Sequence, residues 1–342
     1  MATALLSSLG HPSTFQELGK GGEGQVFAVS THPQLVYKQY LNTAATAPGQ
    51  SALQGLIDLK SSMNPDEQTW LSERTIWPEV IVVEQGRMRG FLMRKIAPEY
   101  FRQQGIRISP RNVLCEWNLL AMRDRYLNNP NVVSNVPRVE PFDALKLVVD
   151  LAKTVALLHK YRVIVGDMSG RNLLWTDRPT WRVLIIDCDS LRIDGSNGVA
   201  SPKQSPDWED PYLTSATTTQ SSDIYKLGLA AFRGVWAATT DRPDHSLPLH
   251  APSGIPDELV KLVLDSTGAS NRPSADDWVN KLQQSIRFGG RPVVSVAKPA
   301  SQPVKQGSGA APSTPATAVS TTIPRSARPV IKMKEPPPGS TT

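Results

Sequence analysis

Residues 165–172 read Val-Gly-Asp-Met-Ser-Gly-Arg-Asn, and this stretch lies between an amphipathic segment and a short apolar run that ends in acids. Asp167 and Asn172 stand five positions apart in a sequence typical of a turn. An aspartate in this setting can accept a proton from an attacking hydroxyl, and the side-chain oxygen of the asparagine can bind a divalent cation. The alternative is an Asx-rich turn that only joins a helix to a strand.

The segments on either side of this loop have regular patterns. Apolar side chains recur at helical spacing over residues 143–159, which predicts a helix; they are Leu147, Val148, Leu151, Val155 and Leu158. Residues 183–186 form an apolar run, and the tripeptide Asp-Cys-Asp (187–189) ends it. Carboxylates at a strand end can bind Mg2+, which favours one or two carboxylates together with phosphates. A capped strand end with solvated acids is the alternative.

Two further motifs lie nearer the N-terminus. Residues 18–26 read Leu-Gly-Lys-Gly-Gly-Glu-Gly-Gln-Val, a G-x-G-x-x-G-x-V pattern whose glycines would let the backbone approach phosphates closely. A strand rather than a helix follows, which argues against a dinucleotide-binding turn. Lys38 shares a predicted strand face with Val36, and a lysine among apolar neighbours needs an anionic partner such as a phosphate. A glycine-rich surface turn and an ordinary edge-strand lysine are the alternatives.

The remaining pattern divides the body of the chain into two parts. Short β-like runs occur at 24–29, 35–40, 80–85 and 89–96, with a predicted hairpin turn at Gln-Gly-Arg-Met (85–88). Helical stretches near 51–63 and 66–75 interrupt them, and from about residue 111 onward the pattern is mostly helical. We therefore expect an α+β body.

Together, and in this order, the four motifs resemble the protein-kinase-like superfamily. The resemblance covers about residues 15–288 and implies a two-lobed protein-kinase-like fold, with a β-rich N-lobe at 15–96 and a mainly helical C-lobe at 97–290. It continues in S-D-I-Y-K-L-G (222–228), which is similar to a helix start of the family, and in N-R-P-S (271–274).

Shorter stretches narrow the resemblance. The sequences E-R-T-I-W-P (73–78) and I-D-C-D-S (186–190) are similar to those of a bacterial atypical kinase group. This group is known alongside von Willebrand A-type proteins and PP2C-type phosphatases, so the resemblance implies partners of these two types.

The resemblance implies ATP and Mg2+ as cofactors and phosphoryl transfer to Ser or Thr hydroxyls of an unidentified protein substrate. Asp167 matches the catalytic base, Lys38 and Arg171 would supply positive charge at the phosphates, and Asn172 and Asp187 match the metal ligands. Four glycines of the glycine-rich loop would hold the phosphates: Gly19, Gly21, Gly22 and Gly24. The adenine would lie between Val26 and Leu174, with Met93 in the segment that joins the two lobes.

Some positions depart from the family pattern. Val165 replaces a histidine, and Asp189 replaces the glycine of D-F-G. Asp-Pro-Tyr (210–212) lies where A-P-E is expected, so the glutamate that would pair with Arg272 is missing, and Glu209 is a nearby substitute by charge only.

A helix glutamate that would pair with Lys38 is not obvious; the two predicted helices offer Gln54, Asp58, Glu67 and Glu73. A nucleotide-binding pseudokinase scaffold is therefore the second interpretation. A small-molecule kinase of the aminoglycoside-phosphotransferase type is the third. The segment 187–211 has the length of an activation loop, with serines at 190, 196, 201 and 205 that could be phosphorylated or incidental.

Charge is distributed unevenly along the 342 residues. The formal net charge is +6, and residues 291–342 alone carry seven basic residues and one acidic residue, so the body is neutral and is not expected to bind nucleic acid. The same tail holds 10 of the 29 prolines and few large apolar residues, so we expect it to be disordered. Residues 1–14 are expected to form an N-terminal extension.

The sequence gives no sign of a disulfide framework, a signal peptide or a membrane span. The two cysteines, Cys115 and Cys188, are too few for a disulfide framework. The N-terminus does not resemble a signal peptide, and no stretch approaches the roughly 18–20 apolar residues of a membrane span. We therefore expect a cytoplasmic protein with no membrane segment.

Overall fold

The computed structural model describes residues 3–11, 14–21, 24–41, 47–106, 111–124, 132–199, 204–214 and 217–288. The chain divides into two units, 1–293 and 294–342, and the described residues all lie in the first. The tail that we expect to be disordered lies outside the described residues.

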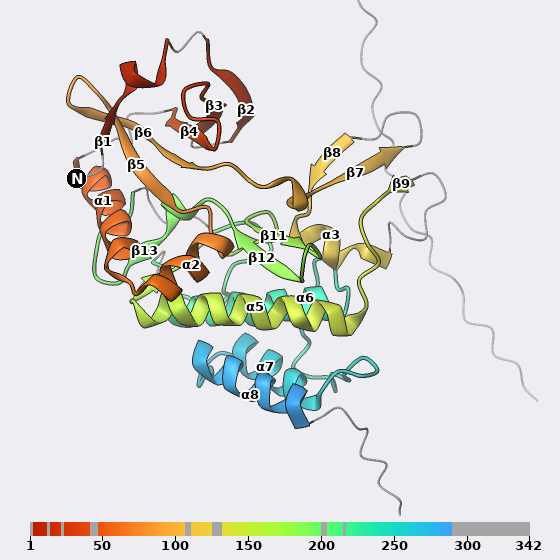
Figure 1. Ribbon diagram of the computed structural model, residues 1–342. Helices are drawn as coiled ribbons and strands as arrows, with labels where there is room; N and C mark the ends of the chain where they lie inside the picture. The colour runs from red at the N-terminus through yellow and green to blue at the C-terminus, as the bar shows by residue number, and fades with distance from the viewer. Residues whose placement is uncertain are drawn as a thin grey trace, which may run out of the picture. The chain divides into compact units, whose positions relative to one another are not determined.

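A six-stranded sheet forms the N-terminal part of the described chain (Figure 1). Its strands are β1 (Thr3–Leu5), β2 (Gln16–Lys20), β3 (Gly24–Ala28), β4 (Leu35–Tyr40), β5 (Pro78–Glu84) and β6 (Arg87–Arg94). They lie in the order β1-β5-β6-β4-β3-β2, and all neighbours are antiparallel except β1 and β5. The four expected strands are confirmed, and β1 adds a strand within the expected N-terminal extension.

The sheet settles two local expectations. Gln85 and Gly86 join β5 to β6 with positive φ angles of 50° and 74°. A two-residue hairpin turn needs such angles for its twist to match the right-handed twist of the two strands. Strand β4 pairs with β3 on one side and β6 on the other, so the interpretation of Lys38 as an edge-strand lysine is wrong.

The chain after residue 97 contains more strands than expected. A three-stranded sheet has the order β8-β7-β9, built from β7 (Phe101–Ile106), β8 (Arg111–Leu114) and β9 (Val132–Ser134). Two antiparallel pairs follow: β10 (Val163–Ile164) with β13 (Arg192–Ile193), and β11 (Leu173–Thr176) with β12 (Arg182–Ile185). The expectation of a mostly helical pattern was incomplete here, because the pairing of these short strands depends on neighbours that local composition does not reveal.

Helices make up most of the rest. The α-helices are α1 (Ala47–Ser62), α2 (Pro65–Arg74), α3 (Trp117–Ala121), α5 (Pro141–Lys160), α6 (Gln220–Val235), α7 (Asp257–Thr267) and α8 (Ala275–Phe288). Short 3-10 helices lie at η1 (Leu6–Leu9), η3 (Pro98–Tyr100) and η4 (Cys188–Ser190). Helices α1, α2 and α5 confirm the expected helices, and the five apolar side chains predicted to face the core from α5 are all fully buried.

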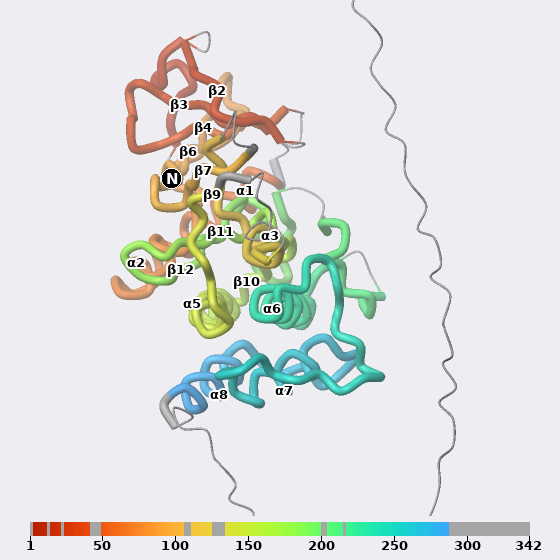
Figure 2. Tube along the Cα trace, turned by 90° about the vertical axis from the view of Figure 1, so that its right-hand side faces the viewer, coloured from red at the N-terminus to blue at the C-terminus, as the bar shows by residue number. Residues whose placement is uncertain are grey.

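Helices α5 and α6 lie side by side, and α7 and α8 pack against them (Figure 2). The largest apolar core surrounds this pair and includes Leu151, Leu227 and Trp278. Helix α6 begins with a capping box in which Thr219 and Ser222 satisfy each other's backbone N–H groups. Of the helices within the described residues, none is both long enough and apolar enough to cross a bilayer.

Candidate functional site

Lys38 forms a buried ion pair with an acid far away in the sequence. Its Nζ donates to Asp189 Oδ1 over 2.7 Å and to Asp187 Oδ1 over 3.4 Å, and it lies 149 residues from Asp187. Lys38 is 6% exposed and Asp189 3%, whereas the Asp187 side chain is 52% exposed. The chain therefore brings the sheet lysine to the acids that end β12.

The second oxygen of Asp189 is also occupied. Tyr40 donates its hydroxyl to Asp189 Oδ2 over 3.0 Å. Tyr40 and Lys38 stand two residues apart on β4 and so share one face of the sheet. Burial alone would lower the pKa of Lys38, but the carboxylates of Asp189 and Asp187 outweigh it and hold that pKa above its usual value.

The four helix residues considered as partners of Lys38 bond elsewhere. Gln54 donates to Asp58, Glu67 accepts from Lys160 and Tyr161, and Glu73 pairs with Arg74. None of these four residues is the close partner of Lys38, because the carboxylate nearest to its Nζ belongs to Asp189. The sequence showed Asp189 as an acid in place of the glycine of D-F-G, but only the fold shows that this residue lies beside Lys38 on β4.

Local backbone geometry separates the two acids. Asp187 has a left-handed conformation (φ 57°, ψ 40°), which short polar side chains tolerate better than most. The 3-10 turn η4 follows and buries Cys188, whose thiol pKa burial raises. Asp187 is thereby left half exposed while Asp189 points into the protein, so the alternative of two solvated acids at a strand end is wrong for Asp189.

Asp167 and Asn172 contact each other directly. Asn172 Nδ2 donates to the backbone oxygen of Asp167 over 2.9 Å and to its Oδ2 over 3.0 Å. Ser205 adds two bonds: its backbone N–H donates to Asp167 Oδ1 over 3.1 Å and its hydroxyl to Oδ2 over 3.2 Å. A hydroxyl can therefore reach the oxygen that a general base would use.

Asp223 holds this loop in place from the first turn of α6. The backbone N–H groups of Val165 and Gly166 donate to its two oxygens over 2.7 and 2.9 Å, and His159 Nε2 lies 3.1 Å from Oδ2. Lys226 Nζ donates to the backbone oxygen of Gly166 over 2.5 Å. The helix expected at 222–228 is confirmed, and its buried polar residues fix the backbone before Asp167.

A second buried ion pair connects the segment after Ser205 to the chain before α8. Arg272 donates to both oxygens of Asp210 over 2.5 and 2.9 Å, and both side chains are almost fully buried. Glu209, the expected substitute, instead lies 3.4 Å from Arg242. The expectation for Glu209 is wrong, because the neighbouring residue carries the carboxylate inward.

The apolar residues proposed for the nucleotide lie together. Met93 and Leu174 are buried in one cluster that also includes Val36, and Val26 packs against it. Gly24 lies where the strands approach closely, since a Cβ there would come 2.7 Å from the backbone oxygen of Gln39. Gly19 lies in β2, and Gly21 donates its N–H to the oxygen of Gly24. Gly22 and Ser201 lie outside the described residues.

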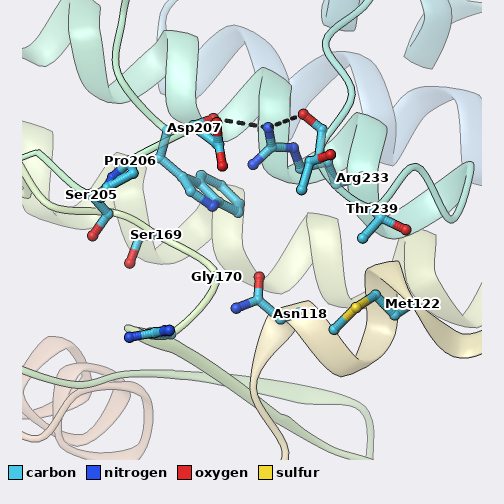
Figure 3. A pocket seen from close by; sticks show the side chains of 12 residues that line it. Asn118, Met122, Ser169, Gly170, Ser205, Pro206, Asp207, Arg233 and Thr239 are labelled. Carbon is cyan, nitrogen blue, oxygen red and sulfur yellow. Dashed lines mark hydrogen bonds between the residues drawn. The ribbon is translucent and has the colours of Figure 1, made fainter. Parts of the chain in front are cut away.

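A cavity of about 360 Å³ lies beside the Asp167 loop (Figure 3). Its lining includes Ser169, Gly170 and Arg171 from that loop, with Ser205, Trp208 and Arg233 from later segments. Arg171 is exposed. Nothing in the sequence patterns pointed to Arg233, because it is one polar residue near the end of a mostly buried helix.

The site thus combines a buried lysine–carboxylate pair with an aspartate–asparagine pair on a fixed loop. A fixed ammonium can neutralise phosphate charge, a half-exposed carboxylate can bind a cation, and a hydrogen-bonded carboxylate can accept a proton. No protein-family model matches this chain, and no match is found among curated proteins.

Proposed function

We propose that this protein transfers the terminal phosphoryl group of ATP, bound with Mg2+, to Ser or Thr hydroxyls of a protein, in a two-lobed fold of the protein-kinase type. The observation that carries the proposal is the approach of Lys38 to Asp187, 3.4 Å apart across 149 residues. Phosphoryl transfer depends mainly on positioning and on neutralising charge, and a lysine beside a metal-binding carboxylate supplies both.

The residues present fit the cofactors. Asp187 is half exposed, so its carboxylate can reach a cation, and Asn172 uses its amide nitrogen toward Asp167, so its oxygen is not used in those bonds. Mg2+ held by these two side chains would neutralise phosphate charge. The buried apolar cluster that includes Met93 and Leu174 supplies apolar surface of the kind against which an adenine ring would pack.

Asp167 is the proposed base. The acceptor oxygen forms the new bond to phosphorus, the bond from phosphorus to the leaving diphosphate oxygen breaks, and the hydroxyl proton passes to a carboxylate oxygen of Asp167. The hydroxyl of Ser205, 3.2 Å from Oδ2, supports the accessibility of that oxygen to an alcohol. Lys38 stabilises the phosphate charge.

Transfer of labelled phosphate from ATP in the presence of Mg2+ tests this proposal. We expect Asp167→Asn to retain nucleotide binding and to lower transfer by about 10²–10⁴-fold, the usual contribution of a general base. Asp58→Asn, which removes an exposed carboxylate of α1, is the matched control and should transfer as the wild type does. Equal incorporation by Asp167→Asn and wild type would refute the assignment.

A nucleotide-binding scaffold that does not transfer phosphate is the second candidate. The observation that favours it is the close contact of Asp189 with Lys38, because a carboxylate already satisfies the charge that phosphates would use. Nucleotide binding without incorporation, equal in wild type and Asp167→Asn, would select this candidate.

A further inference from the structure

Arg233 is a buried cation in the wall of the cavity beside Asp167 (Figure 3). It comes from the last turn of α6 and is 1% exposed. Its Nε donates to the backbone oxygen of Asp241 over 3.1 Å. Its Nη2 donates to the backbone oxygens of Asp207 and Thr240 over 2.8 and 2.7 Å.

These three bonds use backbone carbonyl groups, so no carboxylate is hydrogen-bonded to Arg233, and the carboxylates of Asp207 and Asp241 act on its charge only from farther away. Nη1 makes no hydrogen bond to any described residue, and no carboxylate in the described part of the chain forms an ion pair with this guanidinium. Burial lowers its pKa to about 10, and the positive charge of Arg242 contributes. A buried charge of this kind is normally paired with an opposite charge.

The lining of the cavity favours an anion. Its titratable residues are Arg171, Arg233 and Asp207, which gives a net charge of +1. The indole ring of Trp208 lies against the guanidinium of Arg233, and the distance from the ring centroid to the Arg233 Cζ is 4.7 Å. The ring therefore limits the approach of water from that side.

The cavity is also placed to receive a segment of the acceptor protein. Ser205 both lines it and donates a hydrogen bond to Asp167. Ser169, Gly170 and Arg171 follow Asp167 directly in the same loop. An acceptor whose hydroxyl reaches Asp167 would therefore bring a neighbouring side chain to the cavity.

We propose that this cavity binds an oxyanion of the acceptor protein, either the carboxylate of an Asp or Glu or the phosphoryl group of a phosphoserine close to the acceptor hydroxyl. Nη1 of Arg233 donates to the anion, and the exposed Arg171 adds a second positive charge. The inference rests on the proposed phosphoryl transfer and adds the substrate class, an acidic or previously phosphorylated protein segment.

Binding of fluorescent peptides without ATP tests this site separately from transfer. The peptides share one serine and carry Asp, phosphoserine, Lys or Ala at each of the three positions on either side. We expect at least one Asp or phosphoserine peptide to bind about tenfold more tightly than its Ala counterpart, as a hydrogen bond to a charged group provides. The ratio of the affinities for the Asp and phosphoserine peptides identifies the preferred oxyanion. Inorganic phosphate should compete with these peptides for the cavity.

Asp207→Asn gives the sharpest variant, because the sign of its effect separates an anion site from a cation site. Asp207 has a left-handed φ of 66°, which asparagine adopts readily, and Arg233 contacts only its backbone oxygen. Removing this negative charge should raise the affinity for the acidic peptides about threefold, because the carboxylate of Asp207 and the anion of a bound peptide repel each other. A fall in affinity would overturn the proposal.

Arg233→Lys should lower affinity for the acidic peptides about tenfold, since lysine lacks the guanidinium fork. Arg138→Gln, at a side chain 77% exposed and outside the lining, is the control for loss of one positive charge and should change nothing. If Arg233→Lys does not fold, Thr239→Glu keeps Arg233 and adds a carboxylate to the lining, which should remove the preference for acidic peptides.

Two outcomes separate the site from the proposed reaction. Equal binding of all peptides, or a preference for Lys peptides, would refute the oxyanion site even if phosphate transfer occurs. Anion-dependent binding that is lost in Arg233→Lys, without transfer to any peptide, would support the site and refute the proposed function.

Discussion

Replacing Asp189 by asparagine tests the buried pair that Lys38 forms. The substitution keeps the size of the side chain and an oxygen for the Tyr40 hydroxyl, but it removes the carboxylate 2.7 Å from Lys38 Nζ. Breaking a buried ion pair on one side costs about 3–5 kcal/mol. Asp187 remains 3.4 Å from Lys38, but its side chain is 52% exposed and solvent screens it.

We therefore expect the free energy of unfolding to fall by about 3 kcal/mol, measured by equilibrium urea denaturation. In a body of this size the midpoint of thermal unfolding should fall by about 6–12 °C. Asp58→Asn on α1 is the matched control and should change the free energy of unfolding by less than about 0.5 kcal/mol, as is usual for an exposed residue.

The pH dependence of the difference follows from the sign of the pKa shift. In the wild type the folded-state pKa of Lys38 is raised, so its contribution is present below the unfolded value of about 10.4 and is lost only as the pH rises through the folded pKa. Between pH 7 and 9 it should be constant. In Asp189→Asn, burial lowers the pKa of Lys38 below the unfolded value, so the variant gains stability as the pH rises.

The difference between wild type and Asp189→Asn should thus become smaller from pH 7 to 9. A variant as stable as the wild type at pH 7 would refute the buried pair. A difference that grows with pH would refute the assignment of Lys38 as its cationic member.

Two further predictions concern close packing and the second ion pair. Gly90→Ala should destabilise the protein by at least about 3 kcal/mol in urea denaturation, because its Cβ would lie 1.9 Å from the backbone oxygen of Lys38; wild-type stability would contradict this packing. Asp210→Asn should cost about 3 kcal/mol by the same measurement because it leaves Arg272 buried without its carboxylate, whereas Glu209→Gln should cost less than about 1 kcal/mol. Equal costs for Asp210→Asn and Glu209→Gln would show that the buried pair contributes little.

The sequence predicted the elements whose own pattern is long or regular. The helix expected at 143–159 is α5, because apolar residues that keep a 3.6-residue period over about five turns are typical of a helix and not of a strand. Four of the six strands of the N-terminal sheet, β3 to β6, were also predicted, since β-branched and aromatic residues alternate between turn residues. The short strands β7 to β9 were not, because their pairing depends on neighbours that local composition does not reveal.

The candidate site could be predicted residue by residue but not as a set of pairs. Asp167 and Asn172 were identified together because they lie five residues apart on one loop. The partner of Lys38 was missed because Asp189 is 151 residues away, and only the turn after β12 decides which of two acids points inward. Arg233 gave no signal, since its burial beside the cavity depends on the ends of several elements.

The two mispredicted acids share one physical explanation. At Lys38 and at Arg272, a buried cation requires a carboxylate nearby, but the requirement concerns charge and distance and not the element that supplies them. Asp189 meets it from the turn after β12, and Asp210 meets it one residue from the position expected by charge. At both positions the carboxylate comes from another place in the chain than expected, and the buried ion pair is kept.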